Sequence, residues 1–160
     1  MSFDNIVNWF NFEHYRKECD HPIHDIGFFG SKGGLDRADI LKNACREFNR
    51  FSCDIREVGG PFKARWPRTP VAMAQCQILF NKGQKHDGPN QRVIESMMMN
   101  RPLICDRDST DGMNHLFEEG THYLGYETEV DIINQIRWCK DFENRELAAS
   151  MAKRAYDEVM

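Results

Sequence analysis

Apolar residues in this chain follow two patterns, short runs and helical spacing. Short apolar runs bounded by glycine, proline or polar residues predict strands, and they cover residues 25–30, 52–58, 77–81, 102–106 and 122–126. Elsewhere apolar residues recur every three or four positions, which predicts helices over residues 2–18, 35–50, 128–139 and 144–155. Shorter helices are expected after Thr69, after Pro89, and from Thr110 or Asp111 to near Gly120.

This alternation of strands and helices predicts the fold class. Strands separated by helices favour a parallel sheet with helices on both faces, so we expect an α/β, Rossmann-like domain. Thr128, followed three residues later by Asp131, resembles a capping box at a helix start. The core is expected to contain the apolar residues that face inward from both kinds of element: Ile26, Phe28, Leu41, Ile55, Ile78, Phe80, Ile94, Leu103 and Ile104.

Composition and charge narrow the class of protein. The chain has 160 residues, of which 41% are hydrophobic and 29% charged, as is typical of one soluble globular domain. We expect an amphipathic N-terminal arm at residues 1–23 and one domain at residues 24–160. The net charge of −4 disfavours nucleic acid as a partner, and no apolar run approaches the ~18 residues of a membrane span. Because the first residues lack a secretory signal pattern, a cytoplasmic protein is predicted.

Six cysteines are scattered along the sequence without a Cys-x-x-Cys pair. Several fall within apolar patterns, so reduced, buried thiols are predicted. His14, Cys19, His21 and His24 bring metal-binding residue types close together, but their spacing matches no familiar zinc motif. We therefore predict no metal site and interpret this group as solvated histidines on the N-terminal arm.

Polar loops follow the predicted strands at the sheet edge where open α/β folds bind ligands. Residues 30–34, 59–62 and 81–88 contain glycine, and the fourth loop is residues 106–110. Glycine lets the backbone approach a phosphate and present its N–H groups. Each loop by itself also fits a plain turn with its lysines facing water. Basic residues on or beside the loops could supply countercharge: Lys32, Lys82, Lys85, Arg92 and Arg107.

The segment from residue 77 to residue 106 carries the clearest functional pattern. A strand runs into a polar loop, Pro89 stands where a helix would begin, and that helix bears Arg92 and Glu95 before the next strand. In this order of elements, the amides of the helix N-terminus and a nearby carboxylate can hold a nucleotide. The sequence therefore predicts a nucleotide site around the start of this helix.

Four motifs carry a family resemblance. They are DIGFFGS at 25–31, GPNQRVIES at 88–96, PLICDRD at 102–108 and NHLFEEGTHYLGY at 114–126. In this order they resemble the C-terminal half of a GT-B glycosyltransferase of group 1, within it the spore-maturation CgeB-like branch. The resemblance implies binding of a nucleoside-diphosphate sugar as donor substrate, without a further cofactor, and transfer of the sugar to an acceptor.

The resemblance also implies roles for individual residues, although no catalytic residue is assigned. Glu95 is expected to accept hydrogen bonds from the ribose hydroxyls, and Asp87 stands eight positions earlier, where related enzymes often carry another acidic residue. Arg92 is either a phosphate partner or an ion-pair partner of Glu95. The implied nucleotide-sugar-binding residues lie in two loops and at the helix start: Gly30, Ser31, Lys32, Asp87, Gly88, Asn90, Gln91, Arg92 and Glu95.

The resemblance covers only the donor half of such an enzyme, and residues 1–23 are too short to supply an acceptor domain. One hypothesis is a glycosyltransferase that works as a minimal form or completes its cleft as a homo-oligomer or with a second subunit. The other is a non-catalytic nucleotide-sugar binding module acting in sequestration, regulation or assembly. No divalent metal is implied, and the Asp-x-Asp spelling at residues 106–108 is the one exception. The aromatic N-terminal helix is expected to dock a partner or to pack on its own domain.

Overall fold

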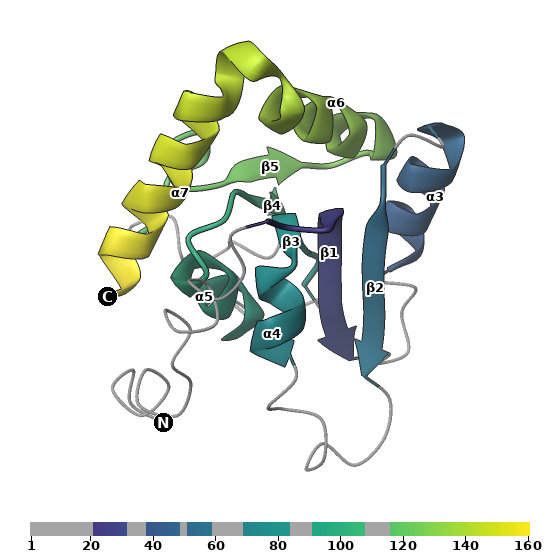
Figure 1. The fold of residues 1–160 in the computed structure, drawn as a ribbon, viewed down its shortest axis with the longest axis horizontal. Coiled ribbons are helices and arrows are strands. Elements are labelled where there is room, and N and C mark those ends of the chain that lie inside the picture. Colours follow the sequence, from purple (N-terminus) through teal and green to yellow (C-terminus); the bar gives the residue numbers. More distant parts are fainter. Residues whose placement is uncertain (1–20, 32–37, 49–50, 59–68, 84–90, 108–115) are drawn as a thin grey trace.

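The structure, a computed structural model, describes residues 21–31, 38–48, 51–58, 69–83, 91–107 and 116–160. These residues form one central sheet with helices packed against it (Figure 1). None of the helices in these ranges is long and apolar enough to cross a membrane. The predicted N-terminal helix over residues 2–18 lies outside the described residues.

The sheet has five strands in the order β2-β1-β3-β4-β5, and every neighbouring pair is parallel. The strand order changes direction between β1 and β3, because β2 lies on one side of β1 and the later strands lie on the other. Such a switch point is where open α/β sheets bind ligands. The strands are β1 His24–Ser31, β2 Cys53–Val58, β3 Cys76–Asn81, β4 Leu103–Asp106 and β5 Leu124–Tyr126.

Helices cover both faces of the sheet (Figure 1). On one face lie α3 (Asp39–Phe48) and α6 (Glu129–Lys140). On the other lie α4 (Thr69–Ala74), α5 (Gln91–Met98) and α7 (Arg145–Val159), and the short 3-10 helix η4 (Phe142–Asn144) joins α6 to α7. The predicted α/β, Rossmann-like parallel sheet with helices on both faces is therefore confirmed.

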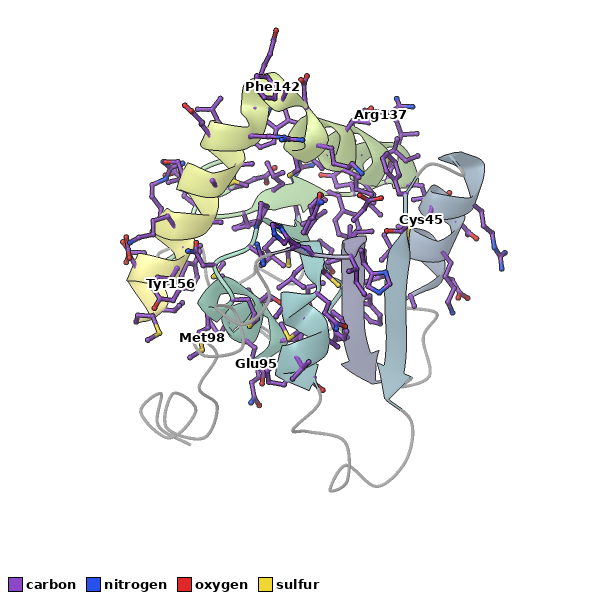
Figure 2. The ribbon with its side chains drawn as sticks, viewed as in Figure 1. Cys45, Glu95, Met98, Arg137, Phe142 and Tyr156 are labelled. Atoms are coloured by element: carbon purple, nitrogen blue, oxygen red, sulfur yellow. A yellow bond between two sulfur atoms is a disulfide. The ribbon has the colours of Figure 1, made fainter. Side chains whose placement is uncertain are left out.

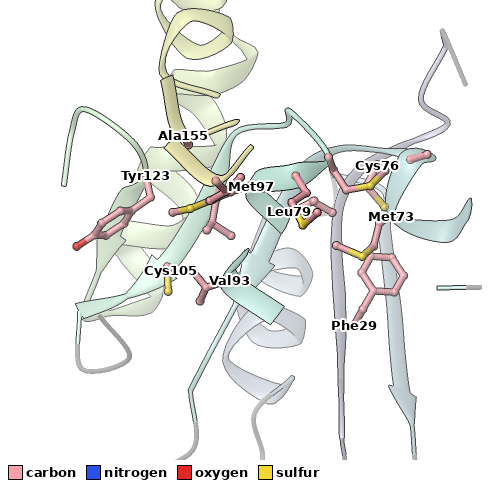
Figure 3. Packing of buried hydrophobic residues seen from close by; sticks show 14 of the residues in the cluster. Phe29, Met73, Cys76, Leu79, Val93, Met97, Cys105, Tyr123 and Ala155 are labelled. Carbon is pink, nitrogen blue, oxygen red and sulfur yellow. The ribbon is translucent and has the colours of Figure 1, made fainter. Parts of the chain in front are cut away.

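Each face of the sheet has its own apolar cluster. Between the sheet and helices α4, α5 and α7, side chains such as Met73, Leu79 and Met97 are in contact (Figure 3). On the opposite face, the rings of β1, β3 and β5 lie side by side. The Phe80 ring stacks on Tyr126 with centroids 5.0 Å apart. Such contacts bury large apolar areas and stabilise the layered arrangement.

Most of the predicted core residues are buried, with Ile94 half-buried against the cluster of the α5 face. The side chain of Ile55 lies outside those the structure describes. The buried ones come from both faces of the sheet: Ile26, Phe28, Leu41, Ile78, Phe80, Leu103 and Ile104.

The start of α6 confirms the predicted capping box. Thr128 Oγ1 accepts a hydrogen bond from the backbone N–H of Asp131 at 3.2 Å. In return, Asp131 Oδ2 accepts one from the backbone N–H of Thr128 at 2.9 Å. Two N–H groups that the helix itself leaves unpaired are thereby satisfied.

The predicted helix that ends near Gly120 is wrong over its described part. None of residues 116–120 is helical: Leu116 and Gly120 lie in turns, and Glu119 makes an isolated bridge to Tyr123. Gly120 has a φ angle of 79°, in the left-handed region that glycine adopts without a steric penalty. The expected start of this helix, at Thr110 or Asp111, lies outside the described residues.

The prediction of reduced cysteines is wrong for one pair. Cys45 on α3 and Cys53 on β2 form a disulfide. Cys76 and Cys105 are buried reduced thiols, and Cys139 is a half-buried one. Sequence spacing did not reveal the pair, because it depends on how α3 lies relative to β2 in the folded protein.

Candidate functional site

The ends of β3 and β4 meet at the ligand-binding edge of the sheet. The backbone N–H of Gly83, just after β3, donates to Asp106 Oδ1 at 2.9 Å. This bond fixes the direction in which the chain leaves β3. Asp106 is the first member of the Asp-x-Asp spelling, and Asp108 lies outside the described residues.

Asn81 connects three strand ends and is completely buried. Its side-chain Nδ2 donates to Cys105 Sγ on β4 at 3.5 Å, and its backbone carbonyl oxygen accepts from the Tyr126 hydroxyl on β5 at 3.3 Å. Buried polar groups of this kind need partners, because an unsatisfied one costs about 1–3 kcal/mol. Asn81 therefore holds the edge in register, a role that its sequence position did not indicate.

The predicted residues Gln91, Arg92 and Glu95 are brought together on α5. Gln91 Nε2 donates to Glu95 Oε1 at 2.9 Å. Arg92 Nη1 forms an ion pair and hydrogen bond with Glu95 Oε2. In Figure 2, Glu95 lies at the end of the molecule toward which the arrowheads of β1 and β2 point. The two oxygens of one carboxylate are thus held by two different donors.

Glu95 is buried rather than solvent-facing, with 0% relative exposure. Burial raises the pKa of its carboxyl, and the neighbouring Arg92 charge and the two hydrogen bonds oppose that rise. Burial also lowers the pKa of Arg92, opposed by Glu95. A buried carboxylate with a raised pKa at the ligand edge of a sheet is a candidate binding residue.

Arg92 is held from two further sides. Its Nη1 lies 3.9 Å from Met73 Sδ on α4, and its backbone carbonyl accepts from Ser96 Oγ at 2.7 Å. Only 17% of its side chain is exposed. Of the two roles that the sequence left open for Arg92, the ion pair with Glu95 is therefore the one seen in the structure.

A second charged group lies beyond β4 and β5. Arg107 forms a two-point hydrogen bond with Glu119, at 2.9 Å and 2.8 Å, and a further one with Glu127 at 2.6 Å. These contacts lower the pKa of Glu119. The three side chains are exposed. Arg107, which the sequence offered as phosphate countercharge, thus contacts two carboxylates.

Of the other predicted site residues, two are described by the structure and four are not. Gly30 and Ser31 end β1 at the same edge, and a Cβ at Gly30 would lie only 2.5 Å from Cζ of Phe28. Four lie outside the described residues, and their roles stay predictions: Lys32, Asp87, Gly88 and Asn90. Among the residues that the structure does describe, no group of three or more His, Cys, Asp or Glu side chains could hold a metal ion.

Comparison of the sequence with protein families shows which family the chain belongs to. The model of the glycosyl transferase-like family matches residues 37–160. This match spans more than half of the chain, so the chain belongs to the glycosyl transferase-like family. Among curated protein sequences, none matches it.

Solved structures show the same fold at low sequence identity. The C-terminal domain of LpcC, a group 1 glycosyl transferase of Francisella tularensis, has a TM-score of 0.66 and 12% identity, over 93% of this chain and 91% of that one. The C-terminal CMP-Kdo binding domain of WaaA from Acinetobacter baumannii has a TM-score of 0.61 and 9% identity, over 93% and 96% of the two chains.

A third structure is twice as long as the matched region. HepE of Anabaena, in complex with UDP and glucose, has a TM-score of 0.67 and 14% identity, over 92% of this chain but 46% of the HepE chain. The present chain therefore spans about half of HepE. The fold is that of the C-terminal domain of a GT-B glycosyltransferase.

Proposed function

We propose that this protein binds a nucleoside-diphosphate sugar and transfers the sugar to an acceptor, as the donor half of a glycosyltransferase. The observation that carries the proposal is the Glu95 carboxylate, held by Gln91 and Arg92 near the start of α5. It stands at the ligand edge of a sheet whose strand order reverses between β1 and β3. Membership of the glycosyl transferase-like family supports the same activity.

The proposed chemistry depends on position and charge. Two neighbouring ribose hydroxyls are donors that suit the two oxygens of Glu95. The first amides of α5 and the dipole of the helix face the diphosphate. During transfer, the bond from the sugar carbon to the diphosphate oxygen breaks and a bond to an acceptor hydroxyl oxygen forms, whose proton passes to water or to the departing diphosphate. Negative charge then grows on the departing nucleoside diphosphate, where amides and cationic groups stabilise it.

The proposal also covers partner, subtype and location. A second subunit, or a second copy of this chain, would supply the acceptor side. The CgeB-like subtype is proposed from the four sequence motifs. A cytoplasmic location is proposed from membership of the glycosyl transferase-like family, whereas the Cys45–Cys53 disulfide is unusual for that compartment.

A non-catalytic nucleotide-sugar binding module is the second candidate. It is favoured because the match to this chain covers only 46% of the HepE chain. The acceptor side is therefore not assigned to any part of the match. Both candidates bind a nucleotide sugar, but only the first releases nucleoside diphosphate when an acceptor is added. An acceptor-dependent release assay on the bound donor therefore separates them.

Replacing Glu95 with Gln tests the shared binding step. The change keeps the shape of the side chain and removes the charge-assisted acceptor, so binding of a nucleoside diphosphate should weaken by roughly 1.5–3 kcal/mol. Calorimetry with UDP, GDP, ADP, dTDP and CMP sugars on the wild type first identifies the base.

The matched control is Glu143→Gln, an exposed glutamate on η4. It should leave the affinity unchanged. Equal affinity of wild type and Glu95→Gln for a ligand that binds would contradict the role of Glu95. Absence of binding across the panel would contradict the proposed function.

A further inference from the structure

We infer that, in the empty protein, the side chain of Gln91 occupies the position that a ribose hydroxyl takes on Glu95, and that ribonucleotide binding displaces it. The inference rests on the proposed function, because it concerns the same carboxylate. It adds a residue that regulates access to this carboxylate and competes with the ribose diol of the ligand.

The contacts of Glu95 require such a displacement. Gln91 donates to Oε1 and Arg92 to Oε2, and the residue has 0% exposure. A carboxylate oxygen can accept two hydrogen bonds, so each oxygen has capacity for another donor. A ribose hydroxyl can nevertheless reach this buried group only after one of the two donors has moved aside.

Gln91 is the donor that can leave at lower cost. It is exposed and uncharged and is the first residue of α5, so its amide can turn into water and remain hydrogen-bonded. Arg92 is mostly buried and contacts Met73 as well as Glu95. Its departure would leave a buried carboxylate without a counterion, which is strongly unfavourable. Arg92 therefore remains paired with Glu95 and positions it, while the Gln91 side chain is displaced.

This arrangement makes a prediction about ligand chemistry. A ribose O–H takes over the hydrogen bond that the Gln91 amide made to Oε1, and the neighbouring hydroxyl uses the remaining capacity of the carboxylate. Gln91 therefore competes with the ribose diol and not with the base or the phosphates. Only the molecules in which Gln91 has moved away can bind the ribose. The apparent affinity is therefore the intrinsic affinity multiplied by the fraction of such molecules.

The test compares UDP with 2′,3′-dideoxyuridine 5′-diphosphate on the wild type and on Gln91→Met. Methionine fills a similar volume but has no donor. We expect Gln91→Met to bind UDP about three- to tenfold more tightly and the dideoxy analogue with unchanged affinity. The matched control is Gln77→Met, an exposed glutamine at the amino end of β3, which should change neither affinity.

An unchanged or lower UDP affinity in Gln91→Met would overturn the inference, and so would an equal gain for both ligands. If the wild type does not bind UDP, the wider nucleotide panel is tested next. Absence of binding across that panel would contradict the proposed function.

A ligand-free measurement tests the Gln91 contact separately. The hydrogen bond from Gln91 lowers the pKa of Glu95, so NMR titration should give a higher pKa for the Glu95 carboxyl in Gln91→Met than in the wild type. The same pKa in both proteins would overturn the inference whatever nucleotide the protein prefers.

Discussion

Glu95 and Arg92 form an ion pair that is almost wholly removed from water. Taking two charges out of water costs several kcal/mol per ion, and their attraction offsets that cost only when the geometry is good. A buried pair is therefore weak support for stability by itself. Its place near the start of α5, at the ligand edge, gives it more weight as part of a binding site.

Replacing Arg92 with Met should destabilise the fold by about 3 kcal/mol at neutral pH, because it leaves the Glu95 carboxylate buried without a counterion. Adding Glu95→Gln should recover most of the loss, since the double variant buries no charge at this position. Urea denaturation of the wild type, of Arg92→Met and of the double variant measures both effects. Lys153→Met, which breaks an exposed pair with Asp157 on α7, is the control and should cost less than about 1 kcal/mol.

The pH dependence of Arg92→Met follows from the pKa of Glu95. Burial raises that pKa and Arg92 opposes the rise, so the variant should have a still higher value. A carboxyl with a raised pKa in the folded state adds stability below its unfolded pKa of about 4.5, and this is lost as pH rises through the folded pKa. The loss in Arg92→Met should therefore be smallest at acid pH. A loss independent of pH would contradict the assignment.

At the scale of elements, the start of α6 shows how far local sequence can define structure. Thr128 and Asp131 satisfy each other's backbone N–H groups without help from distant residues. The pKa of Asp131 is lowered because the N–H groups of Glu127 and Thr128 donate to its carboxylate. α6 then packs on the sheet through Ile132, Ile133 and Ile136, which belong to the apolar cluster of the α3 face. The cap therefore defines the residue at which the helix begins, and the apolar cluster defines its position on the sheet.

Thr128→Ala should lower the free energy of unfolding by about 1 kcal/mol, the usual cost of losing an N-cap side chain. Thermal or urea denaturation measures it. Thr121→Ala, which removes an exposed hydroxyl-to-Glu118 bond outside any helix start, should cost less. The Asp131 part of the cap is present above the ordinary aspartate pKa and lost as pH falls through its lowered value. Equal losses in the two threonine variants would count against the capping role.

At the scale of the whole molecule, the described residues form one layered α/β fold, that of the C-terminal domain of a GT-B glycosyltransferase. The ligand edge carries Glu95 and the ends of β1 and β3, and the chain corresponds to 46% of HepE. An acceptor needs a surface facing this edge, so the proposed activity requires a further domain, subunit or copy.

We predict that the protein associates with itself or with a second chain, so that light scattering at micromolar concentration gives a mass above the 18.7 kDa of one chain. The physical reason is that a donor half alone leaves its ligand edge open, and the proposed transfer needs a second surface facing that edge. Copurification followed by mass determination distinguishes a homo-oligomer from a complex. A monomer of single-chain mass without a copurifying protein would contradict the prediction.

The sequence by itself determined the kinds and order of most of the described elements, the helix expected to end near Gly120 being the exception. Strand and helix patterns repeat over a few residues, so they depend on local spacing, and the strands near 25–30, 52–58, 77–81 and 102–106 were predicted close to their observed bounds. The carboxylate of Glu95 and its neighbours on α5 were also recognisable, because their spacing and the family motif are local.

Only the tertiary structure decided the burial of Glu95, the disulfide between Cys45 and Cys53, and the bonds that tie Asn81 to β4 and β5. Each depends on which helix or strand packs against which, over separations that periodicity does not encode. The residue types in the site were thus legible from the sequence. The packing around the buried Glu95 carboxylate decided that Arg92 pairs with it and that Gln91 donates to it.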